Sequence, residues 1–221
     1  MLDAAEEVFG TYGFEGGSMR EIAQAAGVAQ SLIHYHYKDK DALYRAVFER
    51  RASAIRAARG QRLEQLFAEE DTPELESILE VMLNPLHELL DARGKDFRFY
   101  LQMVAEVTTS ASPRSIDIMK TYYDPSAEIF LAALEKSMPT LPRDMAVWAY
   151  LFAIGARMQA HINSNRASRL GWSGAESPHG LLIPFVATGI RSLASGANAV
   201  VSVKNPNAAK KRRAIQPRRA R

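Results

Sequence analysis

The sequence predicts an all-α protein, and three features of its residue pattern support this fold class. Apolar residues recur at intervals of three and four along most of the chain, which is the repeat of a helix with one buried face. No long stretch alternates β-branched and polar residues as a half-buried strand would. All ten prolines lie at or beyond Pro73, so the first third of the chain lacks the strongest helix breaker. The chain is therefore expected to be a series of helices separated by glycines and prolines.

Composition narrows the class of protein further. The chain has 221 residues, of which 47% are hydrophobic, enough to build one large domain or two small ones. It has no cysteine, which excludes disulfides, thiolate metal sites and cysteine nucleophiles. No apolar run reaches the roughly 18 residues that span a bilayer, and the first residues do not read as a signal peptide. We therefore expect a cytoplasmic protein with no membrane partner.

Charge is distributed unevenly along the chain. The net charge is +3, but eight of the 28 basic residues lie between Lys204 and Arg221, a segment with no acidic residue. The rest of the chain then has 20 basic against 25 acidic residues. Charge therefore indicates nucleic-acid binding only for the tail, and any case for DNA binding by the body must come from motif geometry.

The first two helices have recognisable ends. Apolar residues over 1–12 share one helix face, and Gly13 can end that helix in a left-handed turn. Ser18 stands three residues before Glu21, the spacing of a capping box in which each side chain satisfies the other residue's backbone. This predicts a second helix that starts at Ser18 and that Gly27 is placed to end.

A third, short helix is expected from Gln30 to His36. The alternation His34-Tyr35-His36-Tyr37 would put two imidazoles on one face of a strand, where they could chelate a metal. In a helix the same two histidines are separated by about 200° and cannot hold one ion. The helix assignment therefore predicts no metal site here.

Caps and breakers delimit the remaining helices. Asp39 can cap a long fourth helix. Pro85 and Pro125 fall inside two later helices, where we expect kinks. Beyond Gly196 the composition turns to Ala, Asn, Pro and basic residues, which is typical of a disordered tail. The later helices are expected near residues 73–93, 96–110, 114–138, 142–164 and 178–195.

The spacing of small and apolar residues within 18–43 indicates how two helices pack against each other. Ala23 is small enough for two helices to cross closely, and Gly27 permits a tight turn. Val28 and Ile33 can then fill the angle between the helices. This is the arrangement of a helix-turn-helix, whose second helix can lie in the DNA major groove. Such spacings also occur in plain helical hairpins, so this pattern by itself leaves both interpretations open.

The stretch from Met1 to Leu43 carries a denser pattern: A-x-x-x-F and G-[YF], then S/T-x-R-x-I-A-x-x-A-G-V, then L/I-Y-x-[YH]-F-x-x-K-x-x-L. The corresponding residues, with His34 at the Tyr of the pattern and Tyr37 at the Phe, are Ala5, Phe9, Gly13, Phe14, Ser18, Arg20, Ile22, Ala23, Ala26, Gly27, Val28, Ile33, His34, His36, Tyr37, Lys40 and Leu43. In this pattern the chain closely resembles the TetR family of transcriptional regulators. The resemblance implies an N-terminal three-helix helix-turn-helix domain, joined by a long fourth helix to an all-helical ligand-binding and dimerisation domain.

The resemblance also implies which side chains contact a palindromic DNA operator. The DNA-binding residues it implies are Ser18, Arg20, Gln30, Ser31, His34, Tyr35 and Lys40. In such proteins the third helix enters the major groove, where Gln30 can pair with an adenine edge and Tyr35 can lie against a sugar or a thymine methyl. Ser18, Arg20 and Lys40 would contact phosphates near helix N-termini.

A ligand pocket among the middle helices is implied as well. Its candidates are apolar, adaptable side chains, each of which is more often a core residue than a ligand contact. They are Met103, Tyr123, Phe130, Trp148, Phe152 and Met158. They indicate a hydrophobic or aromatic ligand. Arg157 and His161 are able to orient a carboxylate, or lie on the surface with no such role. The helices at 142–164 and 178–195 would form the homodimer.

Three parts are thus predicted: a helix-turn-helix DNA-binding domain (1–45), a ligand-binding and dimerisation domain (46–196) and a basic tail (197–221) that adds phosphate contacts or only solubility. The predicted function is a sequence-specific regulator, a repressor released from its operator by a small ligand, with no cofactor. A nonspecific nucleoid-type DNA-binding protein and a helical enzyme are the alternatives. Against an enzyme, the chain has no G-x-S-x-G, P-loop, dinucleotide or H-E-x-x-H motif.

Overall fold

A computed structural model describes residues 1–86, 97–162, 164–174 and 178–195. Within these ranges the regular structure is entirely helical, so the predicted all-α class is confirmed. The helices are α1 (Leu2–Gly16), α2 (Met19–Ala26), α3 (Gln30–His36), α4 (Lys40–Glu69), α5 (Leu75–Leu83), α7 (Arg98–Thr109), α8 (Pro113–Ile118), the π-helical turn η1 (Met119–Tyr123), α9 (Asp124–Ser137), α10 (Arg143–Ile162), α11 (Ser164–Arg169) and α12 (Pro178–Ala194).

The ends of the first helices follow from the predicted signals. Gly13, at φ 71°, interrupts the helical backbone inside α1, although the chain stays helical to Gly16. The backbone N–H of Glu21 donates to the Ser18 hydroxyl at 3.2 Å, and the backbone N–H of Ser18 donates to the Glu21 carboxylate at 3.0 Å. The capping box is thus present. Gly27 ends α2 at φ 65°, a left-handed conformation that glycine adopts without strain.

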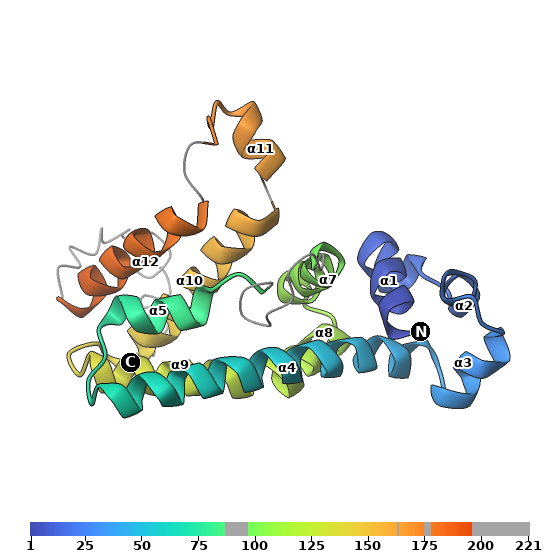
Figure 1. Cartoon of the computed structure of the whole chain (residues 1–221), viewed down its shortest axis with the longest axis horizontal. Coiled ribbons are helices and arrows are strands. Elements are labelled where there is room, and N and C mark those ends of the chain that lie inside the picture. Colours follow the sequence, from blue (N-terminus) through green and yellow to red (C-terminus); the bar gives the residue numbers. More distant parts are fainter. Residues whose placement is uncertain (87–96, 163, 175–177, 196–221) are drawn as a thin grey trace, which may run out of the picture.

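The longest helix, α4, connects the two ends of the molecule. Its 30 residues correspond to about 45 Å, and α1, α2 and α3 gather where it begins, while α5 and α9 lie toward its other end (Figure 1). Asp39 caps it as predicted, because its carboxylate accepts the backbone N–H of Ala42 at 2.8 Å. Val47 and Phe48 belong to the core under α1–α3, and Leu63 belongs to a second core with α5, α9, α10 and α12. A displacement of α4 is therefore felt in both cores.

Proline explains why α5 is shorter than expected. The helix ends at Leu83 instead of continuing toward residue 93, and residues 87–93 of that prediction lie outside the described ranges. Asn84, which precedes Pro85, has ψ 139°, because the proline ring disfavours a helical conformation in the residue before it. The expected kink is therefore a helix end.

The helix predicted over 114–138 is divided into three pieces. The π-helical turn η1 separates α8 from α9, and Pro125 stands in the first turn of α9. Proline cannot donate a backbone hydrogen bond and its ring crowds the preceding turn, which favours a widened turn just before it. The kink expected at Pro125 is thus present as a change of helix type. The short helix α11 was not predicted.

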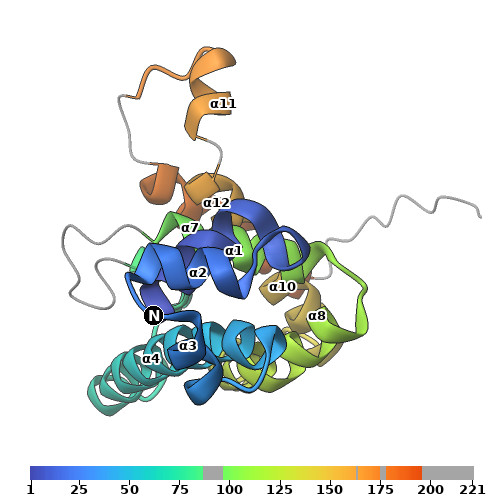
Figure 2. The same cartoon turned by 90° about the vertical axis from the view of Figure 1, so that its right-hand side faces the viewer.

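Helix α7 packs directly against α1, and the two lie side by side in both views (Figures 1 and 2). A Cβ added at Gly10 would stand 2.6 Å from the Cβ of Phe99, so the backbones approach as closely as only glycine allows. On another side of α7, Tyr100 is buried against α4 through Phe48. Within the described ranges, none of the helices has the length and apolar character to cross a membrane.

Candidate DNA-binding surface and ligand cavity

Two hydrogen bonds fix the turn between α2 and α3. The N–H of Gly27 donates to the carbonyl of Gln24 at 3.2 Å, and that of Val28 donates to the carbonyl of Ala23 at 3.0 Å. Ile33 is completely buried where the two helices cross. The helix-turn-helix geometry is therefore present at the residues whose spacing predicted it.

Burial of Ile33 turns the opposite face of α3 toward solvent. The α3 residues predicted to face DNA are all exposed: Gln30, Ser31, His34 and Tyr35. Tyr35 is 83% exposed, and the side-chain amide of Gln30 lies 3.3 Å from the Nε2 atom of His34. The face thus offers amide, hydroxyl and imidazole groups beside an aromatic edge, which is the chemistry that reads base edges in a major groove.

The three predicted phosphate contacts have different surroundings. Arg20 is exposed in the first turn of α2. The hydroxyl of Ser18 is engaged in the capping box. The ammonium of Lys40 donates to the carbonyl of Phe14 at 2.8 Å and to that of Gly17 at 3.1 Å. Lys40 therefore closes the loop between α1 and α2, and its phosphate contact stays a prediction.

A charged group, which we call the Glu6 cluster (Glu6, Arg50 and Arg51), joins α1 to α4. Glu6 is 4% exposed. Its carboxylate accepts from Arg51 at 2.6 and 2.8 Å and from Arg50 at 3.0 Å. Asp3, near the start of α1, accepts from Arg50 at 2.8 Å. The two guanidinium groups are therefore neutralised by carboxylates of α1.

A cavity of about 150 Å³ lies among α4, α7, η1, α9 and α10; we call it the Arg59 cavity. Its walls are mostly apolar, and the hydroxyls of Tyr100 and Tyr123 are hydrogen-bonded at 2.8 Å. The lining residues are Ala52, Ile55, Arg56, Arg59, Tyr100, Leu101, Val104, Thr108, Met119, Tyr122, Tyr123, Ser126, Tyr150, Leu151, Ile154, Gly155, Arg157 and Met158.

Two buried arginines, Arg59 and Arg157, line this cavity at 8% and 7% exposure. The Nη1 atom of Arg157 donates to the carbonyl of Met82 at 3.4 Å. The Nε and Nη2 atoms of Arg59 have no hydrogen-bond partner in the part of the chain that the structure describes. Burial, followed by the nearby charge of Arg157, lowers the pKa of Arg59 to about 9. Arg59 therefore remains a buried cation at neutral pH.

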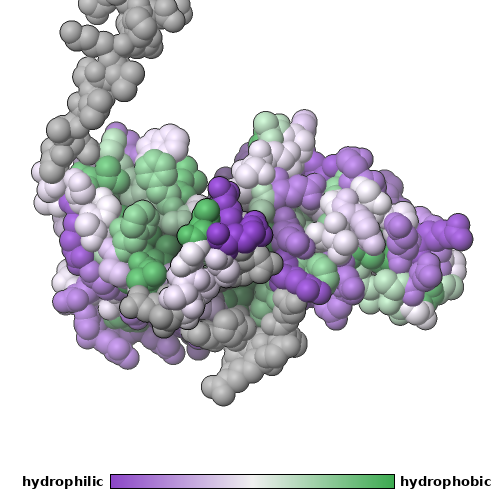
Figure 3. Space-filling model, turned by 90° about the horizontal axis from the view of Figure 1, so that it is seen from above, coloured by the Kyte–Doolittle hydropathy of each residue, from purple (hydrophilic) through white to green (hydrophobic). Residues whose placement is uncertain are grey.

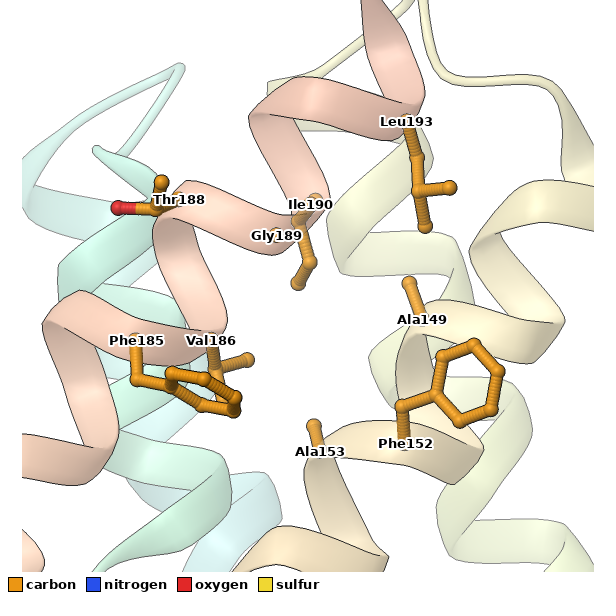
Figure 4. Close-up of a pocket in the computed structure, with 9 residues that line it drawn as sticks. All are labelled: Ala149, Phe152, Ala153, Phe185, Val186, Thr188, Gly189, Ile190 and Leu193. Atoms are coloured by element: carbon orange, nitrogen blue, oxygen red, sulfur yellow. The ribbon is translucent and has the colours of Figure 1, made fainter. Parts of the chain in front are cut away.

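A second hollow, which we call the α10–α12 groove, is open to solvent. It has a volume of about 630 Å³, and Figure 4 shows the side chains that line it from the two helices. Phe152 is 64% exposed and Phe185 is 73% exposed. Figure 3 shows apolar surface gathered toward this end of the molecule, whereas the end formed by α1–α3 is mainly polar on the same face. Large exposed aromatic side chains of this kind mark an interaction surface.

Two family profiles match most of the chain. Residues 1–47 match the bacterial regulatory proteins of the tetR family, and residues 80–189 match the tetracyclin repressor-like C-terminal domain. The protein belongs to the TetR family of transcriptional regulators. Members of this family are typically DNA-binding repressors whose C-terminal domains bind ligands.

Named TetR-family relatives match the DNA-binding end. An HTH-type transcriptional repressor from Mycobacterium tuberculosis is 38% identical over 47 residues, which are 21% of this chain and 25% of the relative. The regulator AcrR from Shigella flexneri is 40% identical over 55 residues, which are 25% of this chain and 26% of the relative. The matched part thus spans about a quarter of the length of these relatives.

Solved structures resemble nearly the whole chain. A transcriptional regulator from Pseudomonas aeruginosa has a TM-score of 0.60 and 18% identity, with 89% of each chain covered. The fatty acid degradation regulator FadR from Bacillus halodurans has a TM-score of 0.54 and 19% identity, with 88% of this chain and 96% of that chain covered. At such identities the likeness concerns the TetR-family fold alone.

The residues predicted to contact a ligand lie in different places in the structure. Tyr123 and Met158 line the Arg59 cavity. Met103 and Phe130 do not, because they fill the two cores at 0% and 1% exposure. Trp148 and Phe152 do not either, because they face solvent at 55% and 64% exposure. Helix periodicity identifies apolar faces, but it does not tell which of them borders a cavity.

Arg157 is not a surface residue, and the side chain of His161 lies outside what the structure describes. Arg59 was not predicted from the sequence, although a signal was available. The buried face of α4 includes, in order, Ala52, Ile55, Arg59 and Leu63. An arginine at an apolar position of this three- and four-residue repeat indicates a buried cation.

Proposed function

We propose that this TetR-family protein is a homodimeric repressor that binds a palindromic operator through α3 and leaves it when a small molecule occupies the Arg59 cavity. The observation that supports this most directly is the exposed face of α3. Ile33 is buried beneath the helix, and Gln30 and Tyr35 are exposed on the opposite side. A groove-reading helix needs this arrangement.

The position of the cavity supports control by a ligand. Helix α4 begins beside α3 and supplies Ile55 and Arg59 to the cavity wall. Helix α7 supplies Tyr100 and packs on α1 at Gly10. A ligand that favours another arrangement of α4 and α7 lowers operator affinity by the ratio of its affinities for the two states.

The α10–α12 groove supports the homodimer. Two copies meeting along α10 and α12 would bury the exposed aromatic side chains in a four-helix contact. Phe185→Asp should then convert the dimer to a monomer in light scattering. Leu170→Asp is the matched control, because Leu170 is 77% exposed but does not line the groove. A dimeric Phe185→Asp variant would place the interface elsewhere.

Selection of bound DNA from random sequence, followed by footprinting, tests the DNA-binding role. We expect a protected palindrome with half-sites about one helical turn, roughly 34 Å, apart. Gln30→Ala and Tyr35→Ala should each weaken binding by about 1–3 kcal/mol, or roughly 10- to 100-fold. Tyr12→Ala is the control, since Tyr12 is an exposed tyrosine of α1, outside α3. Uniform coverage of DNA would instead favour a nonspecific nucleoid-type protein.

The basic tail lies outside the described residues, and its role is tested separately. Deleting residues 204–221 removes eight positive charges. If the tail contacts phosphates, the slope of log affinity against log salt becomes shallower while the preference for the operator is retained. An unchanged slope would assign the tail no part in DNA binding.

A further inference from the structure

We propose that the Arg59 cavity binds a small organic anion, with a carboxylate or phosphate head held by Arg59 and Arg157 and a compact apolar body against the remaining walls. The inference deepens the proposed function, because it names the chemical class of the effector. Its effect at the operator rests on that function, but the binding itself does not.

The buried positive charge of Arg59 favours an anionic ligand. Moving a guanidinium out of water is costly unless carboxylates or hydrogen-bond acceptors replace the water. Arg59 is 8% exposed, and two of its nitrogen atoms have no acceptor among the described residues. An anion in the cavity would supply both the opposite charge and the acceptors. Guanidinium groups bind carboxylate and phosphate oxygens with two parallel hydrogen bonds, which suits a head group at this position.

Arg157 adds a second buried positive charge to the same cavity. Like charges in a buried site repel each other, and the charge of Arg157 contributes to the lowered pKa of Arg59. An anion shared by the two guanidinium groups converts this repulsion into attraction. A neutral ligand does not, and a cation would add to the repulsion. The cavity therefore selects for negative charge.

The walls define the rest of the ligand. Leu101 and Val104 from α7 and Ile154 from α10 form apolar surface, while Tyr100 and Tyr123 add a pair of hydroxyls. A cavity of about 150 Å³ is the size that accommodates a benzene ring. The ligand that fits is therefore an aromatic ring or a short alkyl chain that carries one anionic group.

Calorimetric titration of the full chain with three small molecules, each carrying one phenyl ring, tests the proposed anion site. Sodium benzoate and phenyl phosphate carry the anionic head, and benzyl alcohol is the neutral comparator. We expect one or both anions to bind at least tenfold more tightly than the alcohol, and their order distinguishes a carboxylate from a phosphate effector. Arg59→Gln should weaken anion binding by about 10- to 100-fold, as expected for loss of a charged hydrogen bond, and leave alcohol binding within twofold.

Arg62→Gln is the matched control, because it removes the same charge from the next turn of α4 but Arg62 does not line the cavity. It should leave all three affinities unchanged. Circular dichroism checks that each variant is folded. Arg59→Lys keeps the positive charge but loses the planar guanidinium group, so it should bind anions with intermediate affinity. Equal binding of alcohol and anions, or unchanged anion binding by Arg59→Gln, would overturn the proposal.

Operator binding separates this inference from the proposed function. If the protein protects a palindrome but binds neither anion, the DNA-binding role stands and the anion site is rejected. If an anion binds through Arg59 but operator affinity does not fall, the anion site stands and release by the ligand is rejected.

Discussion

Arginines of α4 belong to two charged sites about two turns apart, the Glu6 cluster and the Arg59 cavity, and these sites differ in whether the protein supplies the opposite charge. In the Glu6 cluster, burial disfavours the charge of Arg51, but its hydrogen bonds to Glu6 and the negative charges of Glu6 and Asp3 together raise the pKa of Arg51 above its ordinary value. In the Arg59 cavity, burial lowers the pKa of Arg59 to about 9. The same side chain on the same helix is thus stabilised as a cation at one position and destabilised at the other.

The difference separates a structural joint from a candidate binding site. The Glu6 cluster fixes α1 on α4, so it holds the DNA-binding unit on the helix that leads to the cavity. The Arg59 cavity costs stability, because its cation has no carboxylate partner among the described residues. Residues that reduce stability without a structural benefit are characteristic of functional sites.

The largest expected effect is at the Glu6 cluster. Glu6→Gln removes the buried carboxylate that pairs with Arg51 and one of the two carboxylates that pair with Arg50, and it should lower the free energy of unfolding by about 3 kcal/mol. Asp3→Asn is the control: its carboxylate also pairs with Arg50 but is 87% exposed, so its loss should cost less than about 1 kcal/mol. Urea unfolding measures both. If the two variants lost equal free energy of unfolding, the pairing through Glu6 would stabilise the protein no more than the exposed pair of Asp3 with Arg50.

A smaller effect is expected where α7 packs against α1. Gly10→Ala places a methyl group against the backbone of Phe99 and should cost about 1–3 kcal/mol by overpacking. Gly60→Ala, in the open interior of α4, should stabilise by about 0.5–1 kcal/mol because alanine favours the helix. Urea unfolding measures both changes in the free energy of unfolding. A loss for Gly10→Ala with a gain for Gly60→Ala would confirm the close approach of α1 and α7, and changes of the same sign would contradict it.

Removing the charge of Arg59 should stabilise the protein. Arg59→Met keeps much of the apolar stem, removes a buried cation and should raise the free energy of unfolding by about 1 kcal/mol. The same substitution at Arg51 should destabilise, because it leaves Glu6 with fewer donors. The opposite signs expected at Arg59 and Arg51 directly test whether the protein supplies a counter-charge at one position and not at the other. Destabilisation at both positions would assign Arg59 a structural role.

The smallest effect concerns pH. Between pH 6 and 8 benzoate stays ionised and Arg59 stays protonated, so benzoate affinity should be constant. Above about pH 9 the guanidinium of Arg59 loses its proton, and affinity should fall by up to tenfold per pH unit. Arg59→Gln should lack this decline. A wild-type profile that falls between pH 6 and 8 would point to another titrating group.

Local signals explain why the DNA-binding end was predicted closely. The signals at this end act over no more than four residues. Ser18 and Glu21 form the capping box of α2, Gly27 ends that helix, and Asp39 caps α4, so the sequence alone determines where α2 and α4 begin. The burial of Ile33 then follows from the turn. The exposed face of α3 needs no information from distant parts of the chain.

The cavity depends on long-range packing and was predicted only in part. Tyr123, the last residue of the π-helical turn η1, borders the cavity, whereas Phe130, seven residues later in α9, fills a core. The sequence pattern did not indicate that turn. Arg59 was open to detection, since it interrupts an apolar repeat, but its lack of a carboxylate partner emerges only once α7 and α10 are in place.

The most direct test of the central claim is the melting temperature of the wild type and of Arg59→Met, measured against benzoate concentration. Without benzoate the variant should melt higher, because it lacks the buried charge. As benzoate is added, the wild type should gain stability by mass action and overtake the variant, which should respond little. The two curves should therefore cross. Parallel curves, or a variant that melts lower at every concentration, would contradict an anion site built around Arg59.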